Sequence, residues 1–177
     1  MENEKKYNKD DAYQTLGLIN SWINNVDTKA SFALAFQAVV IGFCFNNGWP
    51  SAIDKIVNTL PKDRIILDWI CAIAVVLFIV GSALSALFLL LTLVAKTKNT
   101  TGKKSVMFFG TIAASSLNDY KSKAMNMSDV DLTKDLLEQV HTNSCICTVK
   151  FKRYSTGMKI MIPVFIYGII ILSCGLI

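Results

Sequence analysis

The feature that most constrains this chain is an apolar stretch of 31 residues from Ile65 to Ala95, in which Asp68 is the only charged residue. An α-helix needs about 20 apolar residues to cross the hydrocarbon core of a bilayer. A helix that is apolar around its whole circumference is not typical of the surface of a soluble domain. The stretch therefore predicts a membrane-spanning helix, and the rest of the chain must be placed relative to that membrane.

Two further stretches are apolar enough to cross a bilayer. One follows Lys29 and reaches Trp49 without a charged residue, and the other runs from Ile160 to Ile177. The segment before Lys29 has apolar residues at three- and four-residue steps, so we expect one helix from about Ala12 to Phe45. The chain is thus predicted to be an all-α membrane protein with transmembrane helices at about 30–48, 66–93 and 159–177.

The region between the second and third spans is more polar and predicts further helices. The block from Ser105 to Tyr120 is apolar but too short to cross a membrane, which leaves a core helix and an interfacial helix as alternatives. Ser128 or Asp129 is a suitable N-cap for a helix over about 132–154. We place Pro163 in the first turn of the last span, where its missing N–H costs least.

The distribution of Lys and Arg predicts the orientation of the spans. Four of the 18 basic residues precede the first span, three lie in the loop 46–64, eleven lie between Lys96 and Lys159, and none follows. Because cytoplasmic loops carry the excess of positive charge, the N-terminus is expected in the cytoplasm and the C-terminus on the periplasmic or extracellular side. We expect a single domain over 1–177, with a small helical cytosolic body formed by 1–29 and 96–158.

The chemistry-bearing residues do not form a pattern that predicts catalysis. His141, Cys145 and Cys147 have loosely ligand-like spacing, but Cys147 is expected to point away from the other two and a fourth ligand is missing. We favour a helix face with two buried thiols over a zinc site. Neither a phosphate-binding Gly-rich loop nor a nucleophile elbow is present. We therefore expect no enzymatic activity, no metal and no cofactor.

Charged residues at the predicted membrane boundary leave two interpretations open. Asp27 can pair with a cation of the later cytosolic helix, Lys150 or Lys152, or it can contact a ligand directly, and we favour the pairing. Lys29 can anchor the helix by extending its side chain to the headgroups.

The segment from Lys96 to Lys104 and the pair Phe108–Phe109 each admit a structural and a ligand-binding role. The basic segment can meet anionic lipid, which we favour, or a phosphate-bearing ligand. The aromatic pair can pack in a core or interface, which we favour, or stack on a nucleobase.

Three motifs in a fixed order relative to the spans carry a resemblance to a known family. They are W-I-x-x-x-D-x-K-A-S from Trp22, F-F-G-x-I-A from Phe108 and D-L-L-E-Q-V-H-x-N-S-x-I-x-x-x-K-F-K from Asp135. With the spans, they make the chain from about Tyr13 to Tyr167 resemble the Pycsar effector domain, the membrane effector of bacterial pyrimidine-cyclase antiphage systems. One departure is the linker KTKNTTGKK after Ala95, which lacks a proline-containing turn.

The resemblance implies a function in antiviral defence. A partner cyclase makes a cyclic nucleotide, such as cyclic UMP or cyclic CMP, and the effector senses it and impairs the bacterial inner membrane. The infection is thereby aborted. No nucleic-acid partner is implied. Matching of the motifs leaves these ligand-binding or coupling candidates: Asp27, Lys29, Phe109, Gly110, Gln139, Asn143 and Lys150.

The lipid bilayer and further copies of the chain are the other expected partners. Three helices enclose no aqueous pore of useful width, so damage would require a homo-oligomer. Gln37 in the first span and the small residues Gly81, Ser82, Ala83, Ser85 and Ala86 in the second are candidate contacts between helices. The alternative function is a constitutive membrane scaffold or small transporter subunit without nucleotide gating.

Overall fold

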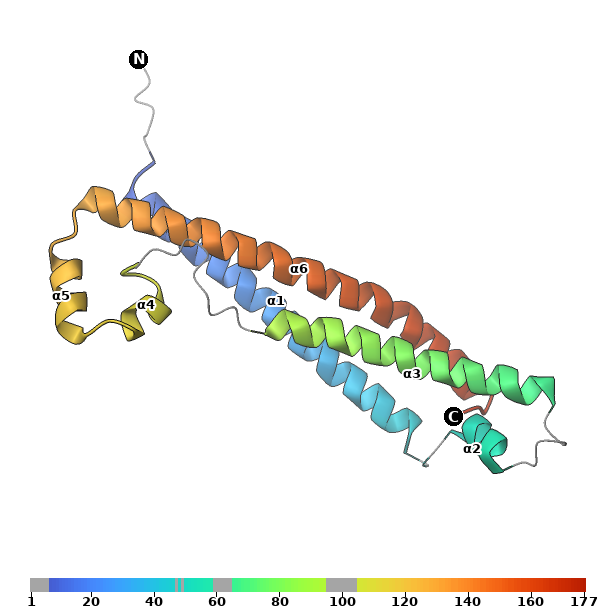
Figure 1. Ribbon diagram of the computed structural model, residues 1–177. Helices are drawn as coiled ribbons and strands as arrows, with labels where there is room; N and C mark the ends of the chain where they lie inside the picture. The colour runs from blue at the N-terminus through green and yellow to red at the C-terminus, as the bar shows by residue number, and fades with distance from the viewer. Residues whose placement is uncertain (1–6, 47, 49, 59–64, 95–104) are drawn as a thin grey trace, which may run out of the picture. The chain divides into compact units, whose positions relative to one another are not determined.

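Every regular element in the described part of the chain is a helix. The computed structural model describes residues 7–46, 48, 50–58, 65–94 and 105–177. The helices are α1 (Lys9–Cys44), α2 (Ser51–Asn58), α3 (Ile66–Leu93), α4 (Phe109–Ala113), α5 (Leu117–Met125) and α6 (Asp129–Ser173) (Figure 1). The predicted all-α class is confirmed.

The chain divides into two compact units, and α1 and α6 contribute residues to both. The polar unit comprises residues 1–26 and 94–150, and the membrane unit comprises 27–93 and 151–177. These bounds lie close to the predicted cytosolic parts 1–29 and 96–158. The basic segment 96–104 lies outside the described residues.

Three helices, α1, α3 and α6, are long and apolar enough to cross a membrane, which confirms the three predicted spans. The first span ends earlier than expected because α1 stops at Cys44 and a turn follows over Phe45 and Asn46. Helix α3 agrees with the prediction for the second span, from Ile66 to Leu93.

Helix α6 differs from the prediction because it is one helix of 45 residues. We expected a helix over 132–154 followed by a separate span at 159–177. The placement of Pro163 in a first turn was wrong, since it lies deep inside α6. The change from polar to apolar sequence near Lys159 marks a change of surroundings, and the backbone continues through it. The cost of Pro163 is limited to one missing backbone hydrogen bond and local crowding.

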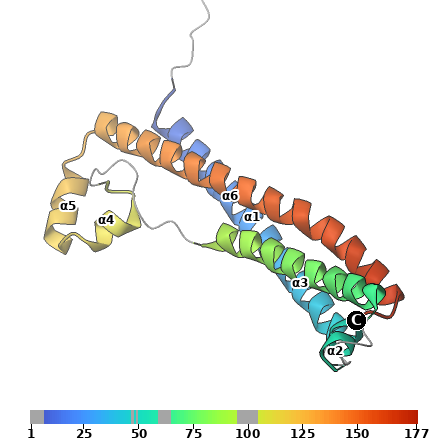
Figure 2. The same ribbon diagram turned by 45° about the vertical axis from the view of Figure 1, so that its right-hand side comes forward.

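In the membrane unit, α1, α3 and α6 lie side by side (Figures 1 and 2). Two apolar clusters tie the three helices together. One contains Ala30, Ala33 and Leu89 with partly buried Tyr154 and Met158 packed against them. The other contains Cys44, Phe78 and Ile171. Each cluster draws on all three helices, so the unit is a three-helix bundle.

Small residues allow these helices to approach closely. A Cβ added at Gly157 of α6 would lie 2.9 Å from Leu89 Cγ, and one at Gly168 would lie 2.5 Å from Phe78 Cε2. Ser85 is buried and its hydroxyl donates to the carbonyl oxygen of Gly157 (3.0 Å). Such contacts replace the hydrophobic driving force that is missing between helices in lipid. The small-residue face predicted for the second span is confirmed at Gly81, Ser82 and Ser85, whereas Ala83 is exposed.

Polar contacts close both ends of the bundle. Beside α2, Lys55 Nζ lies 2.8 Å from the buried Asp68 carboxylate, and this hydrogen bond raises the pKa of Lys55. Ser51 Oγ donates to the carbonyl oxygen of Gly175 (2.8 Å). At the other end, Arg153 Nη1 donates to the carbonyl oxygen of Leu91 (2.7 Å), one of the last carbonyls of α3. The charge favours this position because the C-terminal end of a helix is partly negative.

In the polar unit, α1 and α6 pack against each other over their first halves. Asn143 Nδ2 donates to Asn20 Oδ1 (2.8 Å), and Lys9 Nζ lies 2.9 Å from Asp129 Oδ1. Ser128 caps α6, because its Oγ accepts from the backbone N–H of Asp131 (3.2 Å). The predicted N-cap is therefore confirmed at Ser128.

Replacement of Gly157 by Leu should disrupt the bundle. The new side chain would overlap Leu89, whose backbone nitrogen is only 3.4 Å from the Cβ position, and overpacking of this kind costs roughly 1–3 kcal/mol. The thermal midpoint of helix unfolding in detergent should fall. Gly42→Leu is the matched control, because a Cβ at Gly42 meets nothing within 4 Å. Equal midpoints for the two variants would contradict the proposed packing.

Acidification should weaken the start of α6. The hydrogen bond from Lys9 lowers the pKa of Asp129, and the hydrogen bond from Ser128 lowers the pKa of Asp131. A carboxyl whose pKa is lower in the folded state stabilises the fold above its unfolded pKa of about 3.9, and the contribution is lost as the pH falls through the folded-state pKa. Thermal unfolding between pH 6 and pH 3 should show a smaller pH dependence in Asp129→Asn/Asp131→Asn than in the parent chain. An identical dependence would rule this contribution out.

Candidate ligand site

A cavity of about 290 Å³ in the polar unit is lined largely by polar side chains. Its walls come from the segment before α4, from α4 with the turn that follows, and from α5. The lining residues are Ser105, Val106, Thr111, Ile112, Ala114, Ser115, Ser116, Asp119, Tyr120 and Lys123. The cavity thus offers four hydroxyls, a phenol, a carboxylate and an ammonium group.

Ser105 shapes the first wall. Its Oγ accepts from the backbone N–H groups of Met107 (2.9 Å) and Phe108 (3.1 Å), and its carbonyl oxygen accepts from the Thr111 hydroxyl. The backbone N–H of Val106 donates to Asp135 Oδ2 of α6 (2.8 Å). Because Ser105, Val106 and Asp135 are all buried, this wall is held by satisfied hydrogen bonds and is not a loose loop.

One face of α5 forms the opposite wall. Three of the residues that line the cavity come three, four and seven positions after Ser116; they are Asp119, Tyr120 and Lys123. At this spacing the four side chains lie on the same side of a helix. Ser116 is the N-cap, since its Oγ accepts from the backbone N–H of Asp119 (3.1 Å). The same hydroxyl donates to Asp119 Oδ2 (2.6 Å), so the carboxylate is held at the cavity wall.

The predicted residues Phe109 and Gly110 lie beside this cavity in sequence but do not line it. The Phe109 side chain is 63% exposed and its ring packs at a tilt on Phe108, with centroids 4.9 Å apart. Gly110 lies against the Phe108 ring, since a Cβ there would be 2.7 Å from Phe108 Cε1. The F-F-G-x-I-A motif therefore contributes Thr111 and Ile112 to the cavity, and not Phe109 or Gly110.

Of the predicted residues on α6, Gln139 and Lys150 are buried and Asn143 is half-buried. Gln139 is 4% exposed, and its Nε2 has no hydrogen-bond partner among the described residues. The side-chain amide of Asn143 is hydrogen-bonded to Asn20, and Lys150 is buried. None of the three lines the cavity. Asn143 has a structural role in joining α6 to α1.

Asp27 and Lys29 belong to the membrane unit. Lys29 is exposed and Asp27 is half-buried, with its carbonyl oxygen accepting from the Ser31 hydroxyl (3.0 Å). Pairing of Asp27 with Lys150 or Lys152 stays a prediction.

The residues weighed for a zinc site do not share one surface. His141 and Cys145 are exposed, whereas Cys147 is buried, and this burial raises the pKa of its thiol. Of the two thiols expected to be buried, only Cys147 is. The described residues contain no group of three or more His, Cys, Asp or Glu side chains that could hold a metal ion.

Sequence reasoning missed Asp135 and the cavity face of α5. Asp135, Gln139 and Thr142 are spaced by four and three residues and are all buried, so a polar stripe at helical spacing was the available signal. An apolar stripe through Leu136 and Cys147 of the same helix is also buried. A helix with two buried stripes packs against neighbours on more than one side. The helical period of the sequence does not identify those neighbours.

The volume and lining of the cavity suit a small polar ligand. Its volume lies at the lower end of small-molecule sites, which measure about 300–1,000 Å³. A carboxylate that only accepts hydrogen bonds and an ammonium group that only donates them favour a ligand that carries both N–H or O–H groups and negative charge.

Comparison with known proteins supplies the family. The model of the Pycsar effector protein domain matches residues 11–177. The Pycsar effector protein GmPycTM of Gulbenkiania mobilis is 35% identical over 179 aligned residues, which cover 92% of this chain and 90% of that protein. No solved structure matches the chain. The family match includes the three membrane-spanning helices and the described part of the polar unit from Asp11 onward. The chain therefore belongs to the Pycsar effector family.

Proposed function

We propose that this antiphage effector senses a cyclic nucleotide from a partner cyclase and impairs the inner membrane of the infected bacterium. The observation that carries the proposal is the family match over residues 11–177, which joins three spans to a polar unit in one chain. The effector acts as a binding protein and a membrane protein, and not as an enzyme. The alternative, a constitutive scaffold or transporter subunit, would require no second messenger.

The cavity between α4 and α5 is the proposed docking site. Lys123 would pair with the cyclic phosphate, since an ammonium group is a common partner of phosphate oxygens. Asp119 would accept from a base N–H or from the ribose hydroxyl, and Tyr120 offers a ring on which a base can stack. A volume of about 290 Å³ favours one mononucleotide, such as cyclic UMP or cyclic CMP, over a cyclic oligonucleotide.

The response of the membrane follows from the thermodynamic linkage between ligand binding and the conformation of the protein. A ligand can shift a conformational equilibrium only by the difference between its affinities for the two states. Helices α1 and α6 each contribute to both units, so a ligand-induced change at their polar ends has a covalent route into the bilayer. We place the N-terminus in the cytoplasm from the charge asymmetry. Several copies would be needed to damage the membrane, because three helices enclose no wide pore.

Lys123→Glu should abolish nucleotide sensing without unfolding the protein. Loss of one charge-assisted contact and the new repulsion should weaken binding of cyclic UMP or cyclic CMP by about 10- to 100-fold, measured calorimetrically in detergent. Cells that co-express the variant with a pyrimidine cyclase should keep their membrane potential. Lys121→Glu is the matched control, because Lys121 is exposed on the same helix and does not line the cavity.

Two outcomes separate the parts of this proposal. Equal nucleotide affinities for Lys121→Glu and Lys123→Glu would reject the cavity as the docking site and leave the effector function intact. Depolarisation of cells by the parent chain without any cyclase product would reject gating and favour the alternative.

A further inference from the structure

A buried amide in the membrane unit has one polar atom that its neighbours do not satisfy. Gln37 of α1 is 6% exposed, and its Nε2 donates to the carbonyl oxygen of Ser82 in α3 (2.7 Å). Its Oε1 is buried and has no hydrogen-bond partner among the described residues. An unpaired buried acceptor costs roughly 1–3 kcal/mol, and hydrocarbon offers it no alternative partner.

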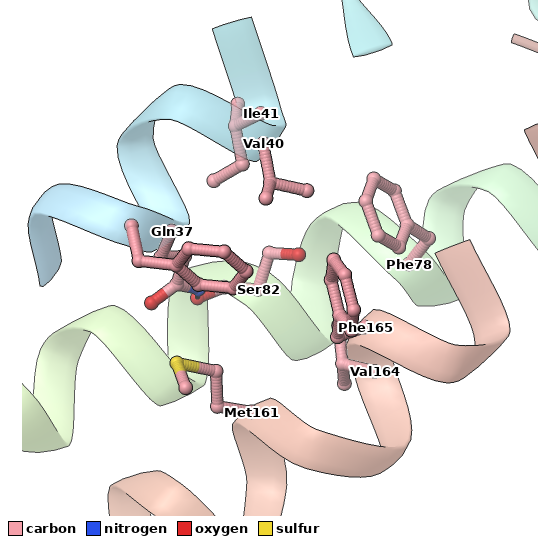
Figure 3. A pocket seen from close by; sticks show the side chains of 9 residues that line it. Gln37, Val40, Ile41, Phe78, Ser82, Met161, Val164 and Phe165 are labelled. Carbon is pink, nitrogen blue, oxygen red and sulfur yellow. Dashed lines mark hydrogen bonds between the residues drawn. The ribbon is translucent and has the colours of Figure 1, made fainter. Parts of the chain in front are cut away.

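The space beside this amide has the size of one water molecule. A cavity of about 20 Å³ is lined by Gln37 and Ser82 together with apolar side chains that include Phe78, Met161 and Phe165. Figure 3 shows these side chains around the same space, with helices α1, α3 and α6 all contributing. A water needs about 10–15 Å³ of such volume and at least two polar partners. A nucleotide would not fit.

The position of the site along the spans is close to the middle of the bilayer. Gln37 follows Asp27 by ten residues and precedes Cys44, the last residue of α1, by seven, which corresponds to about 15 Å and about 10.5 Å of helix. A hydrocarbon core is about 30 Å thick. The unsatisfied amide oxygen therefore lies near the depth at which polar groups are most costly.

We propose that one water molecule occupies this cavity, donates to Gln37 Oε1 and bonds to the Ser82 hydroxyl. When the helices separate, further water molecules enter the bundle at this site. They do so here because the site already holds a water and a polar side chain inside an apolar bundle. This second step rests on the proposed function, whereas occupancy by water does not.

Radiolytic footprinting tests the occupancy. X-ray-generated radicals from a bound water oxidise adjacent side chains, and Met161 lines the cavity whereas Met158, on the same helix, does not. In the full chain in phosphatidylethanolamine and phosphatidylglycerol nanodiscs, Gln37→Leu should lower the Met161 oxidation rate several-fold and leave the Met158 rate unchanged. Ala38→Leu is the matched control, since Ala38 is exposed and does not line the cavity. Gln37→Ile serves if Gln37→Leu fails to fold.

Membrane depolarisation tests the second step. In cells with a pyrimidine cyclase, Gln37→Leu should depolarise the membrane about tenfold more slowly than the parent chain, and Ala38→Leu should match the parent. A Met161 oxidation rate that is the same in Gln37→Leu and the parent would overturn the water site. Loss of Met161 oxidation with normal depolarisation would overturn its role in permeation. If the parent chain never depolarises cells, the proposed function fails, while the footprinting still decides the water site.

Discussion

The membrane unit depends on close contact between helices in a medium that provides no hydrophobic force to bring them together. Gly157 against Leu89 and Gly168 against Phe78 show how this is achieved, since each glycine leaves a space that a large side chain of α3 fills. Dispersion contacts and a few interhelical hydrogen bonds then stabilise the bundle. Large apolar residues on the outside, such as Phe32 and Phe43, remain exposed for lipid.

The polar groups of this unit are treated differently at the ends and in the middle. Asp68 and Arg153 are placed where an ammonium group or terminal helix carbonyls can satisfy them. In the middle, Gln37 donates from its Nε2 to the carbonyl oxygen of Ser82, while its Oε1 has no protein partner among the described residues and lies beside a cavity of one-water size.

The polar unit combines rigid positioning with an accessible cavity. Asp135 fixes the segment before α4 through the N–H of Val106, and Ser116 fixes Asp119 at the start of α5. Both contacts are hydrogen bonds between residues that a ligand need not displace. The walls of the cavity are therefore held in place by hydrogen bonds within the polar unit.

Composition was enough to determine the helical class and the three spans, because a bilayer constrains length and apolarity directly. The orientation drawn from the distribution of charge stays a prediction. The motifs were enough to indicate the family. Only the tertiary structure decided that α6 is continuous through Pro163, that Asp135 holds a cavity wall and that Lys123, not Phe109, lines the cavity. Helical periodicity indicates that one face of a helix is buried. Which segment packs against that face depends on contacts between residues far apart in the sequence, and a single sequence does not show which of these residues meet.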